Sequence, residues 1–129
     1  MKKVWINGCF DVLHRGHVEM FKFAKSQGDF LVVGIDSDDR VRQLKGYHRP
    51  INNQEDRRFF LEAIRFIDQV VIFNTESDLI QRIKEVNPEI MIVGSDYRNK
   101  TVIGSEGANN LVFFNRIGNY STTNILGKK

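Results

Sequence analysis

Two histidines separated by a glycine are the strongest chemical feature of the sequence. His14, Gly16 and His17 stand at the start of a predicted helix, where unpaired backbone N–H groups and the helix dipole favour an anion. Gly16 has no side chain, so a phosphate group can approach the backbone closely. Imidazoles donate hydrogen bonds to phosphate oxygens, and protonated imidazoles donate stronger ones. The segment therefore predicts a phosphate-binding site.

Two other kinds of chemistry remain as alternatives for this segment. Histidines also bind metal ions, but no cysteine or acidic cluster nearby completes a zinc set, so we expect no metal ligands in the protein itself. Cys9 with a histidine as base is a conceivable nucleophile. A lone cysteine at the end of a buried strand is more often a core residue, so we favour phosphate binding over both alternatives.

A second chemical feature is the basic segment between the second and third predicted strands. Lys45 precedes Gly46 in a predicted loop, from which a lysine can reach a phosphate. Arg57 lies in the first turns of a predicted helix, where the helix dipole does not favour a cation, so a functional role becomes more plausible. A solvated face is the preferred interpretation for the other arginines considered, Arg40, Arg42 and Arg58.

The third feature lies near the end of the chain. Ser121 and Thr122 stand at the start of a predicted short helix, with Arg116 five residues before Ser121. Hydroxyl groups and free backbone N–H groups together make an anion cradle. Ordinary capping of the helix by Ser121 is the alternative. Because the histidine segment also predicts a phosphate site, we favour phosphate binding for Ser121 and Thr122.

Strands and helices alternate along the chain and must position these residues. Continuous apolar or alternating runs predict strands at 4–9, 30–35, 69–73, 90–93 and 111–114. Helical periods predict helices at 17–27 and 77–86. Two more helices are expected, one capped by Asp36 and one following Asn52, the latter with an apolar face made by Phe59, Phe60, Ala63, Ile64 and Ile67. The pattern predicts an α/β fold, a Rossmann-like doubly wound parallel five-stranded sheet with helices on both faces.

In such sheets, ligands bind outside the carboxyl ends of the strands. Polar and glycine residues gather just after four of the five predicted strands, at 8–17, at Asp36, at 94–96 and at 115–121. We therefore expect the three chemical segments to meet at this edge of the sheet.

Bulk properties agree with a single domain over residues 1–129. The net charge of +3 suits a phosphate-rich ligand without being specific for one. Dense basic and aromatic clustering, which is typical of nucleic-acid binders, is missing, so we expect no nucleic-acid partner. No apolar run is long enough to cross a membrane, so we expect no membrane association. The single cysteine favours a reducing compartment, and we expect a cytoplasmic protein.

Three motifs together resemble the cytidylyltransferase-like family of nucleotidyltransferases, over nearly the whole chain. They are residues 8–11 (Gly-Cys-Phe-Asp), 14–17 (His-x-Gly-His) and 121–123 (Ser-Thr-Thr). Residues 44–51 and 94–97 resemble the branch that adenylylates heptose 1-phosphate. Arg116 resembles the branch that transfers cytidylyl groups to glycerol 3-phosphate. The nucleotide (ATP or CTP) and the phosphorylated sugar or polyol therefore stay open.

The resemblance implies a mechanism in which an acceptor phosphate attacks the α-phosphorus of a nucleoside triphosphate and pyrophosphate leaves. His14, His17, Lys45 and Arg116 would be the catalytic residues, and Mg²⁺ would accompany the triphosphate. Arg57 would neutralise phosphate charge, and Asp11 and Asp96 would face the acceptor or the nucleoside. The remaining nucleotide- or substrate-binding residues implied are Gly8, Cys9, Phe10, Gly16, Gly94, Ser121 and Thr122. The resemblance also implies a homodimer, and a non-catalytic nucleotide-binding regulator is the alternative from another class.

Overall fold

A five-stranded parallel sheet forms the centre of the computed structural model, which describes residues 1–115 apart from the side chain of Asp96. The strands lie in the order β3-β2-β1-β4-β5. Their bounds are β1 (Lys3–Gly8), β2 (Phe30–Asp36), β3 (Gln69–Phe73), β4 (Ile90–Gly94) and β5 (Asn110–Phe114). The chain builds outward from β1 to one edge and then returns to build the other. The expected doubly wound Rossmann-like sheet is therefore confirmed.

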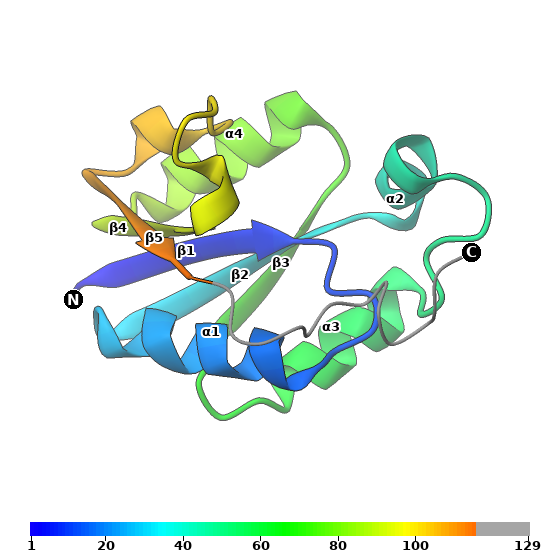
Figure 1. The fold of residues 1–129 in the computed structure, drawn as a ribbon, viewed down its shortest axis with the longest axis horizontal. Coiled ribbons are helices and arrows are strands. Elements are labelled where there is room, and N and C mark those ends of the chain that lie inside the picture. The colour runs from blue at the N-terminus through cyan, green and yellow to red at the C-terminus, as the bar shows by residue number, and fades with distance from the viewer. Residues whose placement is uncertain (116–129) are drawn as a thin grey trace.

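Helices cover both faces of this sheet (Figure 1). Helix α1 (Arg15–Ser26) and helix α3 (Gln54–Glu62) lie on one face, and α4 (Glu76–Val86) lies on the other. Helix α2 (Asp38–Lys45) lies beyond the carboxyl ends of the strands. Two short 3₁₀ helices, η1 (Ser95–Tyr97) and η2 (Ser105–Gly107), precede β5.

The core is divided between the two faces because successive strand residues point to opposite sides. Along β1, Val4 and Ile6 pack into the cluster beneath α1 and α3, whereas Trp5 packs into the cluster beneath α4. A Cβ atom on Gly34 of β2 would lie 2.5 Å from the Trp5 indole. The indole therefore needs a glycine on the neighbouring strand. Burial of both faces explains why the strands read as continuous apolar runs.

The helices around α2 and α3 differ from the sequence predictions. Ser37 caps α2 rather than Asp36, which is the last residue of β2 and is bound by Arg40. Asn53 caps α3 rather than Asn52, whose side-chain amide donates instead to the backbone of Asp11.

The predicted apolar face of α3 was also wrong. The helix ends at Glu62 and buries Arg57 and Leu61, while Phe59 and Phe60 are 70% and 45% exposed. Beyond the helix Ala63 is exposed, and Ile67 packs on the core from the segment that leads into β3. Ile64 also packs against the core from beyond the helix, so the expected burial is confirmed for Ile64 and Ile67. It is wrong for Phe59 and Phe60, which lie within the helix but on its exposed side. The short helix expected at Ser121 lies outside the described residues.

Candidate active site

A cleft of about 500 Å³ opens at the carboxyl end of the sheet. It lies where polar residues were expected to gather after the strands. Of the residues predicted for the site, Gly8, Cys9, Phe10, Asp11, His17, Lys45 and Gly94 line this cleft. The structure therefore brings together residues from the ends of β1 and β4 and from the helices that follow β1 and β2.

The two histidines form a reciprocal cap at the start of α1. The backbone N–H of His17 donates to Nδ1 of His14 (3.4 Å), and the backbone N–H of His14 donates to Nδ1 of His17 (3.3 Å). The two rings stack, with centroids 3.7 Å apart. Because each Nδ1 accepts a hydrogen bond, the geometry assigns the proton of each neutral ring to Nε2. One arrangement thus caps the helix and makes Nε2 of each ring a donor.

His17 is held in its neutral form. Burial, followed by the charges of His14 and Lys45, lowers the pKa of His17 from 6.5 to about 4. The positive end of the α1 dipole acts in the same direction. At neutral pH, His17 therefore offers an uncharged N–H donor to the cleft, and an anionic ligand would favour its protonation.

Three cationic side chains join His17 in the cleft. Arg40 is paired through Nε with Asp36 (2.8 Å), and Arg49 is paired through Nε with Asp11 (2.7 Å). Lys45, at the end of α2, has no carboxylate partner among the side chains that the structure describes, which do not include Asp96. The expectation that Arg40 belongs to a solvated face was wrong, and the role of Arg49 was missed.

Asp11 borders the cleft, but its carboxylate is buried and occupied. It accepts from the backbone N–H groups of Ile51 and Asn52 (both 2.8 Å) and from Arg49. Burial alone raises the pKa of Asp11, but the hydrogen bonds from Asn52, Ile51 and Arg49 outweigh it and lower that pKa. Asp11 therefore anchors the segment before α3, a placement that does not fit direct contact of its carboxylate with a ligand.

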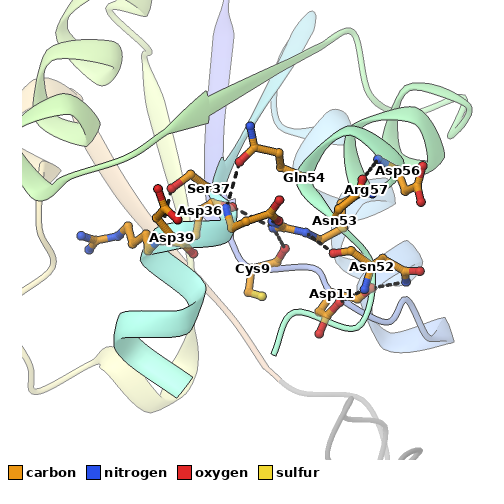
Figure 2. Close-up of polar contacts among 12 residues, drawn as sticks. Cys9, Asp11, Asp36, Ser37, Asp39, Asn52, Asn53, Gln54, Asp56 and Arg57 are labelled. Atoms are coloured by element: carbon orange, nitrogen blue, oxygen red, sulfur yellow. Dashed lines mark hydrogen bonds and ion pairs between the residues drawn. The ribbon is translucent and has the colours of Figure 1, made fainter. Parts of the chain in front are cut away.

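Arg57 is the centre of a second buried network (Figure 2). Its side chain is fully buried and donates from Nη1 to the carbonyls of Cys9 (3.0 Å) and Asp36 (2.8 Å). Nη2 donates to the Asp38 carboxylate (2.9 Å), and Nε donates to the carbonyl of Asn52 (2.9 Å). The guanidinium therefore ties the ends of β1 and β2 to α2 and α3. This placement corrects the expectation that Arg57 touches phosphate, because the group lies behind the cleft.

The remaining predicted residues fall into two groups. His14 and Gly16 lie at the start of α1 but do not line the cleft. Asp96 lies in η1, and the position of its side chain is not described. The predictions for Arg116, Ser121 and Thr122 fall outside the described residues.

The two alternative chemistries gain no support from this geometry. Burial raises the pKa of the Cys9 thiol, against smaller opposing effects of Lys45 and Arg57, so the thiol is not activated as a nucleophile. Among the described residues, no three His, Cys, Asp or Glu side chains are grouped so as to hold a metal ion.

In the same part of the chain, no helix combines the length and apolar character that a membrane span requires.

An apolar wall completes the cleft and was not predicted. Its accessible part is formed by Val93 of β4 and by Val102 and Ile103 of the segment before β5, whereas Phe73, Leu79 and Ile92 border the cleft from the buried core. Residues 99–110 had no predicted structure, so Val102 and Ile103 were missed, whereas the expected burial of Leu79 is confirmed. A cleft with one apolar and one cationic part suits a ligand that joins a flat ring to phosphate groups.

The model of the cytidylyltransferase-like family matches residues 5–125. The chain belongs to this family of nucleotidyltransferases. The resemblance drawn from residues 8–11 and 14–17 is thereby confirmed. Bifunctional protein HldE of Campylobacter fetus is 46% identical over 125 residues, which are 97% of this chain and 27% of that protein. Bifunctional protein HldE of Helicobacter pylori is 43% identical over 127 residues, 98% of this chain and 27% of that protein.

The chain thus spans about a quarter of the length of these curated relatives. Among solved structures, a lipopolysaccharide core biosynthesis protein of Thermoplasma volcanium superposes with a TM-score of 0.69 and 29% identity, over 94% of this chain and 99% of that one. The pantothenate synthetase of Thermus thermophilus superposes with a TM-score of 0.62 over 91% of this chain and 56% of its own, at 14% identity. That last likeness shows the fold alone.

Proposed function

We propose that this member of the cytidylyltransferase-like family transfers an adenylyl group from ATP to heptose 1-phosphate and releases pyrophosphate. The observation that carries the proposal is the cleft itself, in which a neutral histidine donor, a lysine and apolar side chains meet at the carboxyl ends of the strands. The Thermoplasma protein named for lipopolysaccharide core biosynthesis supports a sugar acceptor.

The proposed reaction is an in-line displacement. An oxygen of the acceptor phosphate forms a bond to the α-phosphorus, and the bond from the α-phosphorus to the bridging oxygen breaks with pyrophosphate as leaving group. The acceptor phosphate is already ionised at neutral pH, so no side chain has to remove a proton. This agrees with a cleft in which the Asp11 carboxylate is occupied and the unprotonated Nδ1 of His17 already accepts a backbone hydrogen bond.

Under this proposal, the chain contributes positioning and charge stabilisation. His17 donates from Nε2 to triphosphate oxygens in the cleft, and Lys45 places a positive charge against the acceptor or the α-phosphate. His14, which stacks on His17 outside the cleft lining, is a second proposed donor from the sequence motif. Backbone around Gly8 and Gly94 borders the nucleotide. Arg116, Ser121 and Thr122 remain proposed phosphate ligands from the sequence motif.

Mg²⁺ belongs to the proposal as an ion that arrives with the triphosphate. Mg²⁺ commonly keeps several waters and binds substrate phosphates with one or two carboxylates from the protein. In the described part of the cleft, the carboxylates of Asp11 and Asp36 are each paired with an arginine. The donor set therefore fits an ion held mainly by phosphates. When bound, Mg²⁺ would neutralise charge on the phosphates.

The proposal also covers a single domain, a homodimer and a cytoplasmic location. The second candidate is cytidylyl transfer from CTP to glycerol 3-phosphate, which the spacing of Arg116 and Ser121 favours. A regulator that binds nucleotide without turnover is the remaining alternative.

The test is a pyrophosphate-release assay with Mg²⁺ that crosses ATP and CTP with heptose 1-phosphate and glycerol 3-phosphate. We expect activity with ATP and heptose 1-phosphate alone. Activity only with CTP and glycerol 3-phosphate would replace the first candidate by the second. Nucleotide binding without pyrophosphate release from any combination would contradict both candidates.

A further inference from the structure

The backbone at Phe10 adopts a conformation that aromatic residues avoid. Its φ angle is +49°, in the left-handed region that favours glycine. Such a conformation persists when the surrounding structure holds it in place. Here both neighbours in the chain are held, because Arg57 binds the carbonyl of Cys9 and the Asp11 carboxylate accepts three hydrogen bonds. Figure 2 shows Arg57 at Cys9 and Asn52 at Asp11, on either side of the turn.

The turn places the Phe10 ring between the core and the histidine pair. The ring is 7% exposed and meets the His17 imidazole edge-to-face, with centroids 5.2 Å apart and an interplanar angle of 87°. The Phe10 ring also packs against Phe21, with ring centroids 5.0 Å apart. A Cβ atom on Gly8 would lie 2.9 Å from the Phe10 ring, so the ring also fills the space beside Gly8.

We propose that Phe10 is a positioning residue, whose left-handed turn sets its ring against His17 and holds the imidazole with Nε2 directed at the phosphate ligand. The inference rests on the proposed function and deepens it. Phe10 does not touch the reacting atoms in this role. It acts through His17, whose orientation decides where the donor points.

Three contacts together restrain the His17 ring. Nδ1 accepts from the backbone of His14, the His14 ring stacks on one face, and Phe10 closes another side. The hydrogen bond to Nδ1 is long at 3.3 Å and does not hold the ring alone. Removal of the Phe10 ring would let the imidazole tilt and let water reach it. Among the described residues, the charged or titratable groups that act on His17 are His14 and Lys45, and these would stay in place.

The test compares Phe10→Leu with Phe23→Leu. Phe23 lies on the same helix as His17 and packs against Phe114 and the core without lining the cleft, so its variant controls for lost aromatic packing. We expect Phe10→Leu to lower kcat by about tenfold or more while KM for the triphosphate changes less than about threefold, because a misdirected donor costs rate. Phe23→Leu should leave kcat within about threefold of wild type.

A second measurement is independent of turnover. The imidazole pKa of His17, followed by NMR titration and assigned with His17→Asn, should rise by about one unit or more in Phe10→Leu as the ring becomes hydrated. It should stay unchanged in Phe23→Leu. Phe10→Met retains most of the side-chain volume and serves as a second variant, with the same rise and the same loss of kcat expected if Phe10→Leu is too unstable for assay.

An unchanged His17 pKa and unchanged kcat in Phe10→Leu or Phe10→Met would overturn the inference. Equal changes in Phe23→Leu would also overturn it, because they would show a general packing effect. If wild-type protein releases no pyrophosphate, the proposed function fails, and the NMR comparison still decides whether Phe10 controls the environment of His17.

Discussion

Residues 8–17 and residues 36–57 both border the cleft, and they differ in how their side chains are held. In the first region, the two histidines are organised by contacts between residues three apart, the reciprocal cap at the start of α1. In the second region, Arg49 and Arg57 are organised by partners 38 and 48 residues away, Asp11 and Cys9. Both regions are rich in polar groups. Only in the first region are the contacting residues close enough in the sequence for their spacing to indicate that they lie side by side.

The two regions therefore contain two kinds of hydrogen-bond donor: donors that face the cleft and donors that hold the fold together. His17 and Lys45 line the cleft with donors that can contact a ligand. Arg57 is fully buried, with its donors directed at backbone carbonyls. Substitution of His17 or Lys45 should therefore reduce activity, whereas substitution of Arg57 should reduce the stability of the fold.

The largest expected effect is on stability, from Arg57→Ala. The carbonyls of Cys9 and Asp36 would lose their donor, so we expect the free energy of unfolding to fall by about 3–5 kcal/mol. Urea denaturation measures this loss. The matched control is Arg58→Ala, whose half-exposed side chain pairs with Glu62 on the same helix and should cost less than about 1 kcal/mol. Equal stability of the two variants would remove Arg57 from its structural role.

The second effect is on activity, from His17→Asn. Asparagine can still accept the His14 backbone N–H but has no donor at the Nε2 position, so the helix cap survives while the phosphate donor is lost. We expect kcat to fall by about a hundredfold or more, with the free energy of unfolding changed by less than about 1 kcal/mol. Turnover is measured by pyrophosphate release. The control is His48→Asn, which lies on the exposed segment after α2 and should keep wild-type turnover. Wild-type turnover by His17→Asn would show that His17 has no catalytic role.

The third effect is a dependence of stability on pH. The pKa of His17 is about 4 in the folded protein and near 6.5 when unfolded, so the unfolded chain binds more protons between these values. Stability should therefore be full above about pH 6.5 and decrease as the pH falls toward 4, by on the order of 1–3 kcal/mol. Urea denaturation at several pH values, for wild type and His17→Asn, isolates this contribution. A wild-type decrease no steeper than that of the variant would contradict a buried neutral His17.

The smallest effect expected is on substrate affinity, from Lys45→Ala. We expect KM for the acceptor phosphate to rise by about tenfold, the scale of one charged hydrogen bond, with kcat less affected. Arg42→Ala is the control, because Arg42 lies on the same helix, pairs with Asp39 and does not line the cleft. Initial rates at varied acceptor concentration measure the change. Unchanged acceptor kinetics would place Lys45 outside the acceptor site.

The contrast between the regions also explains which predictions succeeded. The five strands and their parallel order follow from continuous apolar runs separated by helical segments, and the position of the cleft follows from the polar residues after those strands. The apolar face predicted for the helix at residues 54–62 was wrong for Phe59 and Phe60, which are exposed, while Arg57 is buried. An arginine can be buried there because four acceptors surround it, and three of them, on Cys9, Asp36 and Asp38, come from other segments of the chain.

The sequence by itself determined the doubly wound sheet and the family, and it placed both histidines at the start of a helix, since each depends on residue periodicity or on groups a few positions apart. The reciprocal cap that the two histidines form was decided by the structure. Only the tertiary structure decided that Asp11 and Arg57 hold loops together, and that Phe10 lies against His17. These roles depend on which carbonyls and rings surround a side chain after the chain has folded. Residue type states what a group can bind, whereas its partner is set by the three-dimensional path of the chain.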